Sequence, residues 1–369
     1  MKVEGQDTIS IKMDEHKGFI EIIDQRLLPH QLQWEKLKTS EDVAIAIKDM
    51  HLRGAPLIGA AAAFGMAFAT REALSSKENF HHFLNSRQTH LESTRPTAVN
   101  LKWATTSMRR AIDDAPERSR YEAAWQAATR VVHDDIEQCR QIGVHGLKII
   151  EELYCKTGRT INVLTHCNAG WLACLDYGTA TSPIYQAYEK GIPIHVWVDE
   201  TRPRNQGAKL TAWELNAAGV PHTVIPDNTG GHLMQHGMVD LVIVGSDRTT
   251  INGDVANKIG TYLKALAAFD NNIPFFAALP KTTFDPTIYD GLNEITIEER
   301  EGTEVSHVDG LADSKLYNVQ ITPNESPTAN YGFDVTPARL VTGLITERGV
   351  CEATQHSILR MYPEFSSQP

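Results

Sequence analysis

The second half of the chain alternates short β-rich runs with longer helix-like segments. The β-rich runs are Thr160–Leu164, Ile194–Val198, His222–Ile225, Leu241–Val244 and Ile273–Ala278. The helix-like segments between them are Pro183–Lys190, Lys209–Ala218, Gly230–Gly237 and Val255–Phe269. Strand starts roughly 20–35 residues apart are typical of βαβ units, and Leu241–Val244 is wholly apolar, as in a strand buried on both faces. The pattern therefore predicts an α/β fold with a doubly wound parallel sheet.

The first half of the chain predicts a mainly helical domain. Ser40 is a candidate helix cap because acidic residues follow it. Helical patterns then cover Pro56–Arg71, Thr97–Asp113 and Arg118–Cys155. We place the domain boundary near residue 150, which gives a helical domain of residues 1–150 and a sheet domain of residues 151–369. Late in the chain, residues 285–330 are turn-rich, and Phe333–Pro337 is expected to open a final helix.

Charge and cysteine content narrow the class of protein. The net charge of −11 argues against a nucleic-acid-binding surface or a membrane-surface helix. No apolar run comes near the ~20 residues that span a bilayer, and the N-terminus lacks the apolar core of a signal peptide. The five cysteines are an odd number without CxxC spacing, which favours reduced thiols over disulfides or a zinc site. We therefore expect a cytoplasmic enzyme.

Two polar turns at strand ends carry the candidate chemistry. Asp247 follows the apolar run Leu241–Val244, and Asn257 and Lys258 come soon after it, where they could hold an oxyanion. Cys167 follows the run Thr160–Leu164 in the same way. Ligands of open α/β sheets bind at the carboxyl ends of strands, so a thiol and a carboxylate there suggest a paired acid/base site. Asp254 is expected to cap the helix that follows it.

Seven peptides, in one order along the chain, resemble a known family. They are Arg53–Pro56, Arg95–Leu101, Thr165–Gly170, Asp199–Pro203, Gln206–Ala208, Asn252–Thr261 and Phe333–Pro337. The chain resembles the methylthioribose-1-phosphate isomerases, which share a superfamily with the regulatory subunits of eukaryotic translation initiation factor 2B. The resemblance covers roughly residues 20 to 350. It implies a helical N-terminal domain, a Rossmann-like C-terminal domain, a homodimer, and an aldose–ketose isomerase that uses no metal or cofactor.

The same resemblance assigns the site. Cys167 and Asp247 are implied as the catalytic pair. The residues implied to hold the phosphate and the sugar are Arg53, Gly54, Ala55, Arg95, Gln206, Asn257 and Lys258. Arg53 and Arg95 each precede a proline-marked helix start, where backbone amides and guanidinium groups can both bind a phosphate. Asp247 is expected to protonate the ring oxygen of the sugar, and Cys167 to carry a proton or stabilise the transition state. Whether hydrogen moves from C2 to C1 as a proton or a hydride stays open.

The substrate implied is a small phosphorylated sugar, a 5-modified ribose 1-phosphate. Either 5-methylthioribose 1-phosphate or 5-deoxyribose 1-phosphate fits, because an apolar pocket separates such tails by only ~1–3 kcal/mol per missing group. We hypothesise that Trp171, where the family usually has a small residue, fills space that a methylthio tail would occupy. The alternatives are a ribose-1,5-bisphosphate isomerase, which needs a second basic cluster, and a non-catalytic regulatory subunit. A dinucleotide-binding dehydrogenase is disfavoured because no GxGxxG follows a strand.

Two further residues have competing interpretations. His166 could be a catalytic base, but its neighbour Cys167 should point to the other face of the strand, so we favour a structural role. Arg202 could bind a ligand, or it could pair with Asp199 or Glu200.

Overall fold

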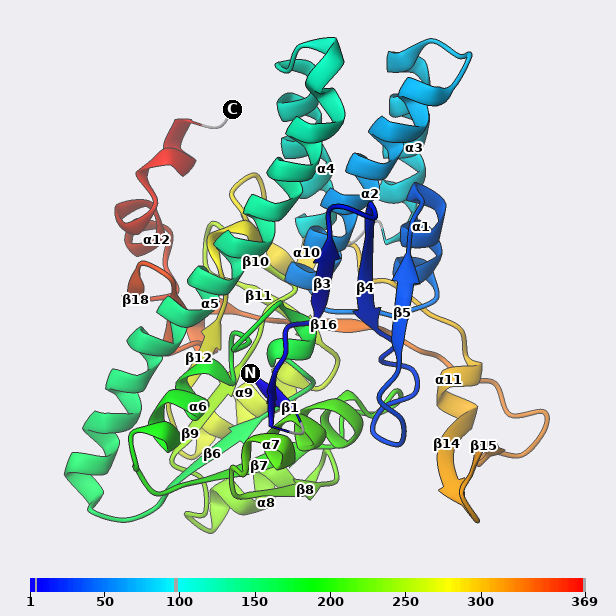
Figure 1. Cartoon of the computed structure of the whole chain (residues 1–369). Helices are drawn as coiled ribbons and strands as arrows, with labels where there is room; N and C mark the ends of the chain where they lie inside the picture. Colours follow the sequence, from blue (N-terminus) through cyan, green and yellow to red (C-terminus); the bar gives the residue numbers. More distant parts are fainter. Residues whose placement is uncertain (4, 96–98, 368–369) are drawn as a thin grey trace.

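A seven-stranded sheet forms the centre of the carboxyl-terminal half (Figure 1). The computed structural model describes residues 1–3, 5–95 and 99–367. The strand order is β18-β17-β12-β9-β6-β7-β8, and every neighbouring pair is parallel except β17 with β18. The strands are β6 (Ile161–Thr165), β7 (Ile194–Asp199), β8 (His222–Ile225), β9 (Leu241–Val244), β12 (Phe275–Ala278), β17 (Gly343–Thr346) and β18 (Gly349–Cys351). The predicted parallel sheet is confirmed, although β17 and β18 were not foreseen.

The order of these strands contains a reversal. From β6 the chain adds β7 and β8 on one side of the sheet, then returns to add β9, β12 and β17 on the other. The boundary between β6 and β9 is therefore a topological switch point, where the connections on either side leave a crevice at the carboxyl ends of the strands. Helices α6 (Ser182–Glu189), α7 (Ala212–Ala218), α8 (Thr229–Gln235) and α9 (Thr261–Asp270) connect the strands, and a π-helical turn at Gly207–Thr211 precedes α7.

The amino-terminal half is mainly helical, as predicted. Its helices are α1 (Ser40–Lys48), α2 (Ala55–Ser75), α3 (Phe80–Thr94), α4 (Val99–Asp113) and α5 (Arg120–Thr157). A small antiparallel sheet of β3 (Ile11–Asp14), β4 (Phe19–Ile23) and β5 (Trp34–Leu37) lies beside them, and β1 (Lys2–Val3) pairs with β2 (Gln6–Asp7). The cap of α1 is Thr39 rather than Ser40, in a capping box with Asp42. The predicted start of α4 at Thr97 lies outside the described residues.

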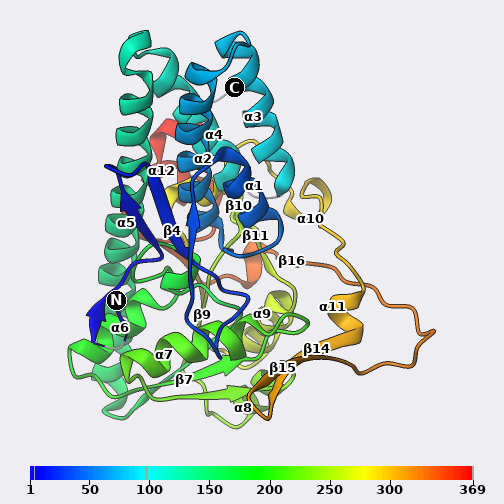
Figure 2. The same ribbon diagram turned by 45° about the vertical axis from the view of Figure 1, so that its right-hand side comes forward.

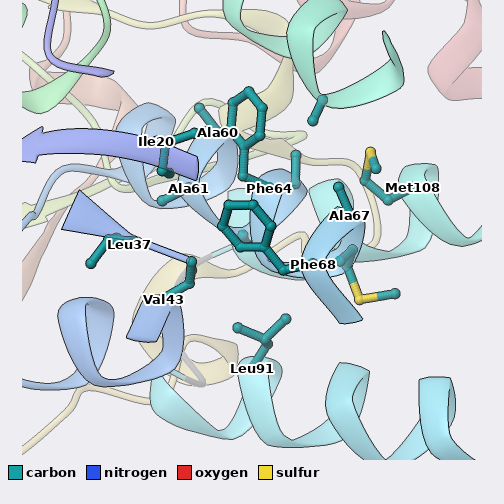
Figure 3. Packing of buried hydrophobic residues seen from close by; sticks show 14 of the residues in the cluster. Ile20, Leu37, Val43, Ala60, Ala61, Phe64, Ala67, Phe68, Leu91 and Met108 are labelled. Carbon is teal, nitrogen blue, oxygen red and sulfur yellow. The ribbon is translucent and has the colours of Figure 1, made fainter. Parts of the chain in front are cut away.

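Helix α2 is the core of this half (Figure 3). Its Phe64, Phe68 and Ala67 pack among side chains from the neighbouring elements, including Leu91 of α3 and Met108 of α4. By length and composition α2 could cross a membrane, contrary to our expectation for the sequence. However, 83% of its apolar window is buried inside the protein, so the apolar composition serves packing.

Helix α5 connects the two halves. It runs along the side of the molecule and packs against α2 and α4 at one end and against α6 and β17 at the other (Figures 1 and 2). Residue 150, where we place the domain boundary, lies inside this single helix. The division into two domains at that point stays a prediction.

Three segments after β9 differ from the predictions. Val255–Lys258 forms strand β11 instead of the start of a helix, and Phe333–Thr336 forms strand β16 instead of opening one. Together with β10 (Arg248–Thr250) and β13 (Phe284–Asp285) they make a four-stranded sheet in the order β13-β10-β11-β16. Asp254 accordingly caps no helix directly after it, because its carboxylate accepts the backbone N–H groups of Gly291 and Ala338.

The turn-rich stretch from 285 to 330 contains defined elements. They are α10 (Gly291–Glu294), α11 (Thr303–Ser306), β14 (His307–Ala312) and β15 (Lys315–Gln320). Strands β14 and β15 form a hairpin that projects from the body of the molecule (Figures 1 and 2). The last elements that the structure describes are α12 (Gln355–Met361) and a short 3-10 helix (Pro363–Ser367).

The packing of α2 gives a prediction about stability. Phe64 is fully buried, and its ring meets that of Trp125 edge-on with the centroids 5.1 Å apart. Phe64→Ala should lower the free energy of unfolding by about 3–5 kcal/mol, through lost burial and the cavity left behind. Urea denaturation followed by circular dichroism measures the change. Leu74→Ala in the same helix is the control, because that side chain is 44% exposed and its loss should change stability by no more than about 0.5 kcal/mol. Equal losses from the two variants would contradict this assignment of the core.

Candidate functional site

The switch point of the sheet brings the two candidate catalytic residues to one edge. Cys167 follows the end of β6 and Asp247 follows the end of β9, and these strands pair directly through Val163 with Leu241. The loops beyond the strands touch as well. A Cβ on Gly245 would lie 2.6 Å from the Cβ of Ala169, so only glycine permits this close approach.

All nine predicted site residues line one hollow, which we call the strand-end pocket. It consists of two adjoining parts that share Arg53, Gly54, Ala55, Cys167 and Asp247. Arg95, Gln206 and Lys258 line one part, and Asn257 lines the other. Residues from both halves of the chain thus meet over the switch point. The order of the peptides in the sequence gave no information on this meeting.

The amino-terminal end of α2 points its first turn into this pocket. Gly54 is the N-cap residue, no side chain caps the helix, and Gly54 and Ala55 both line the pocket. Gly54 has φ of 98°, and a Cβ there would lie 2.4 Å from the carbonyl oxygen of Ala173. Glycine is therefore required twice, for its backbone conformation and for the contact with the loop after Cys167. The uncapped amides and the helix dipole favour an anion at this position.

Cys167 has an unusual backbone. Its φ is 66°, in the left-handed region that few non-glycine residues adopt. Two hydrogen bonds hold it there: its N–H donates to Oγ1 of Thr201 at 2.8 Å, and its carbonyl accepts from Oγ1 of Thr211 at 2.7 Å. Left-handed backbone of this kind is concentrated at functional sites, where the surroundings fix it.

A buried carboxylate fixes the loop that follows Cys167. Glu214 of α7 accepts hydrogen bonds from Nδ2 of Asn168 at 2.9 Å and from the hydroxyl of Tyr185 at 3.0 Å. It also accepts the backbone N–H groups of Trp171 and Leu172 at 3.1 and 2.9 Å. Burial nevertheless raises the pKa of Glu214 to about 7, against the effect of these hydrogen bonds.

The clamped loop in turn orients a cation. Arg53 donates from Nη1 to Oδ1 of Asn168 at 2.6 Å and from Nη2 to the carbonyl of Asn168 at 2.9 Å. Because Glu214 holds the other end of the Asn168 side chain, the guanidinium of Arg53 is positioned through a chain of two hydrogen-bonded groups. Asn168 lies inside the peptide Thr165–Gly170, but nothing in the sequence connects it to Glu214.

Burial and nearby charges oppose each other in the pocket. Burial raises the pKa of the Asp247 carboxyl, and the cations of Lys258, Arg53 and Arg95 hold it lower than burial alone would. Burial likewise raises the pKa of the Cys167 thiol, against the effects of Arg53 and Lys258. Burial lowers the pKa of Lys258. The raised pKa values favour a neutral thiol and a carboxyl that holds its proton more tightly than usual. Groups in these forms can donate a proton.

Arg95 is buried with most of its donors unused. Its Nε and Nη1 have no hydrogen-bond partner among the residues that the structure describes, and Nη2 lies 3.9 Å from Glu298 Oε2. Arg95 is the C-cap of α3, and the helix start expected at Pro96 lies outside the described residues. Asn257 sits on β11, where its Nδ2 donates to Oγ1 of Thr261 at 3.0 Å.

The residues with competing interpretations fall outside the pocket lining. His166 is fully buried, and its ring nitrogens contact Asp199 Oδ2 and the carbonyl of Ile259, both at 2.8 Å, in keeping with a structural role. Arg202 donates to the carbonyls of Pro203 and Val305. These contacts are neither the ligand binding nor the pairing with Asp199 or Glu200 that the sequence suggested. Trp171 is in the core, with its ring 6.0 Å from that of Trp213. Trp171 lines neither part of the strand-end pocket, and the hypothesis that it takes the place of a substrate tail stays a prediction.

Three apolar residues were missed in the part of the pocket that contains Arg95 and Lys258. Met50, Ile58 and Phe333 line the same part as Asp247 and Lys258, and Nζ of Lys258 lies 4.4 Å from the centroid of the Phe333 ring. Ile58 lies on α2 two residues after the peptide Arg53–Pro56, and Phe333 is the first residue of the peptide Phe333–Pro337, so nearness to these peptides is the signal that could have identified both. Met50 carries no such signal.

The chain is similar to known proteins in both sequence and structure. Residues 51–353 match the Initiation factor 2 subunit family. A methylthioribose-1-phosphate isomerase of Sinorhizobium medicae is 57% identical, over 99% of this chain and 100% of that protein. One of Paramagnetospirillum magneticum is 56% identical, over 99% of both.

Two solved structures have a similar fold. One is a 5-methylthioribose 1-phosphate isomerase from Pyrococcus horikoshii, with a TM-score of 0.82 and 36% identity over 97% of both chains. The other is a translation initiation factor eIF-2B, subunit delta, from A. fulgidus, with a TM-score of 0.78 and 36% identity. It covers 97% of this chain and 100% of that one.

The electrostatics of Cys167 predict how it reacts with pH. Because burial raises its pKa above the ordinary cysteine value, the thiol should be neutral at pH 7 and become a nucleophile only in alkaline solution. Alkylation by iodoacetamide at Cys167, followed by peptide mass spectrometry, should rise with pH without a plateau below pH ~9. Lys258→Met should shift the rise to higher pH, because it removes a cation that lowers the pKa of Cys167. Cys155, which is exposed, is the internal control. A plateau at neutral pH would mean that Cys167 is a thiolate and would contradict this assignment.

Proposed function

Because the chain belongs to the Initiation factor 2 subunit family and, within it, to the methylthioribose-1-phosphate isomerases, we propose that it converts 5-methylthioribose 1-phosphate to 5-methylthioribulose 1-phosphate. The reaction is an aldose–ketose isomerisation in methionine salvage. The observation that carries the proposal is the convergence of Cys167, Asp247 and three cations at the switch point of the sheet.

The substrate phosphate needs charge and hydrogen-bond donors, and the pocket supplies both. Arg53 and Arg95 contribute guanidinium groups, and the uncapped start of α2 at Gly54 and Ala55 contributes amides. The unused donors of Arg95 are buried, which is costly unless an anion engages them. Gln206, whose Oε1 is also buried without a partner among the described residues, and Asn257 are assigned to the sugar hydroxyls.

Asp247 is assigned as the general acid. The phosphate ester on C1 prevents ring opening by ordinary mutarotation, so the bond between C1 and the ring oxygen must break while that oxygen takes up a proton. A carboxyl whose pKa is raised by burial holds its proton more tightly than an exposed carboxyl does, which favours this role. Lys258 lies in the same part of the pocket and stabilises the carboxylate that remains after the proton has left.

Cys167 is assigned to the second half of the reaction. After ring opening, hydrogen moves from C2 to C1 and the C2 hydroxyl becomes a carbonyl. In an enolate route the carboxylate left on Asp247 takes the proton from C2, the neutral thiol of Cys167 donates one to C1, and the C2 hydroxyl proton returns to the sulfur. In a hydride route the thiol excludes water from the reacting carbons. The strained backbone of Cys167 fixes the position of its sulfur for either role. Isomerisation in D₂O distinguishes the two routes, since only proton transfer through an enolate exposes the migrating hydrogen to exchange.

The lining of the pocket favours an apolar 5-substituent. Met50, Ile58 and Phe333 present apolar surface within it. An adjoining hollow does contain further cations, but each faces a carboxylate of its own: Arg26 with Asp24, Arg204 with Glu304 and Lys209 with Asp309, at 2.7 to 2.8 Å. A second phosphate, as in ribose 1,5-bisphosphate, would have to displace those carboxylates, which disfavours the bisphosphate substrate.

We also propose that the protein acts as a cytoplasmic homodimer. The hairpin of β14 and β15 projects from the body of the molecule (Figure 2). It carries exposed apolar side chains. They are Leu311, Leu316, Tyr317, Val319 and, just after the hairpin, Ile321, each between 42% and 56% exposed. A cluster of this kind on a projecting element favours contact with a second copy of the chain.

The proposed activity has a direct test. We expect steady-state isomerisation of 5-methylthioribose 1-phosphate, and a fall in kcat of at least about 10²-fold for Asp247→Asn, which removes the acidic proton but keeps the size of the side chain. Asp254→Asn is the matched control, because that residue holds backbone amides outside the pocket. Substrate binding to Asp247→Asn, measured by calorimetry, should remain close to wild type.

The same assay on 5-deoxyribose 1-phosphate and ribose 1,5-bisphosphate separates the substrate alternatives. A higher kcat/KM for either of these sugars would replace the methylthio substrate. No turnover of any of the three, or turnover that Asp247→Asn leaves unchanged, would contradict the enzymatic proposal and favour a regulatory subunit.

The hairpin predicts the behaviour of the dimer. Tyr317→Lys combined with Val319→Lys should convert a dimer to a monomer, because both changes place charge in the proposed contact. Sedimentation equilibrium measures the mass. Val350→Lys on β18, at a residue 42% exposed and away from the hairpin, is the control and should leave the dimer intact. A dimer that survives the double change would show that the contact lies elsewhere.

A further inference from the structure

Three potential metal ligands meet beside the strand-end pocket. Asp135 and Cys139 lie four residues apart on α5, so they share one face of that helix. Cys174 comes from the loop after Cys167 and lines the strand-end pocket. All three side chains are buried, and their ligand atoms lie within 4.8 Å of one another. None of the three is used in the proposed reaction.

The group lacks a positive charge. The carboxylate of Asp135 accepts the backbone N–H of Leu175 at 3.0 Å, and the sulfur of Cys139 lies 4.0 Å from the same oxygen. Within residues 1–3, 5–95 and 99–367, no cationic side chain pairs with Asp135. A buried carboxylate with so few partners is costly unless it takes up a proton or binds a cation directly, and burial raises the pKa of Asp135 to about 7.

A second group of potential ligands shows the contrast. His166, Asp199 and Asp227 also converge, but Lys264 already supplies a cation there, with Nζ 3.2 Å from Asp199. Both ring nitrogens of His166 are engaged as well. That group needs no metal, whereas the group of Asp135, Cys139 and Cys174 has two thiols, one carboxylate and no cation.

We propose that Asp135, Cys139 and Cys174 bind a zinc ion. Zinc prefers thiolate and carboxylate ligands in tetrahedral geometry. With Zn–S and Zn–O bonds of about 2.3 and 2.1 Å, neighbouring ligand atoms would lie roughly 3.6 Å apart. The three ligand atoms lie within 4.8 Å of one another in this structure, so the group must contract on binding. The two thiols release their protons to solvent on binding. The fourth position is left to water, and the strand-end pocket beside Cys174 provides the path of entry.

The zinc would connect two parts of the molecule that build the strand-end pocket. Helix α5 contributes two ligands, and the loop that contains Cys174 also contains Ala173, whose backbone touches Gly54. Since binding to the native state alone stabilises it, zinc should raise the thermal midpoint of the protein. The cysteine spacing in the sequence gave no sign of this site, because 35 residues and a change of fold layer separate Cys139 from Cys174.

The test uses the full chain, reduced with a thiol-free phosphine and freed of metal by a chelator. We expect it to bind one equivalent of Zn²⁺ in competition with a chromophoric chelator, and to show a thiolate-to-metal charge-transfer band with Cd²⁺. Cys139→Ser and Cys174→Thr should each weaken zinc binding at least 10-fold and abolish the shift of the thermal midpoint. Cys155→Ser and Cys351→Ser are the controls, and both should bind as wild type does.

Cys167 is the competing ligand, so Cys167→Ala decides which thiols are involved. If Cys167→Ala still binds zinc, the proposal is supported. If Cys167→Ala no longer binds zinc, the metal belongs to the strand-end pocket instead. X-ray absorption at the zinc edge of the wild-type protein makes the test independent of how the variants fold. Two sulfur scatterers with oxygen are expected. A first shell without sulfur, or no uptake of zinc by the reduced protein, would overturn the proposal.

Discussion

The direct pairing of β6 with β9 is the constraint on which the site depends. Consecutive strands of a parallel sheet are often neighbours, but here two further strands, β7 and β8, are laid down on one side before the chain returns to pair β9 with β6. The reversal leaves the carboxyl ends of β6 and β9 without a connection crossing between them. Cys167 and Asp247 are about 80 residues apart in sequence, and this one pairing places both at the mouth of the same crevice.

A buried carboxylate then makes the loops at this edge rigid. Glu214 is fully buried and accepts four hydrogen bonds, two of them from backbone amides of the loop after Cys167. Burying a carboxylate is unfavourable, as its raised pKa shows, and the hydrogen bonds offset much of that cost. The hydrogen bond from Asn168 to Glu214 holds the Asn168 side chain in place. Asn168 in turn holds the guanidinium of Arg53. Rigidity of this kind reduces the reorganisation that ligand binding would otherwise require.

The sequence predicted the large features because they rest on local patterns. Buried strands such as Leu241–Val244 are apolar throughout, and α5 has a long helical repeat, so both could be recognised without knowledge of the rest. Cys167, Asp247, Asn257 and Lys258 were indicated by their place after apolar runs, and the other five site residues came from the resemblance. The convergence of all nine in space required the structure. Val255–Lys258 was mistaken for the start of a helix because its strand pairing with Phe333–Thr336 joins segments far apart in the chain. Short strands of that kind are decided by tertiary contacts rather than by their own propensity.

The charge of the chain and the charge of its pocket have opposite signs, and this contrast explains the preference for a phosphorylated ligand. The whole chain carries −11, yet Arg53, Arg95 and Lys258 gather around two groups whose raised pKa values favour their neutral forms. Keeping three cations in a buried site is unfavourable without an anion, and burial accordingly lowers the pKa of Arg95 and of Lys258. A phosphate dianion restores the balance, so much of its binding energy comes from relieving a cost already present in the folded protein. The same anion would also reduce the net effect of these cations on Asp247, and so raise the pKa of the carboxyl further. Binding of a phosphate and protonation of Asp247 would thus be coupled through electrostatics, with no movement of the chain required.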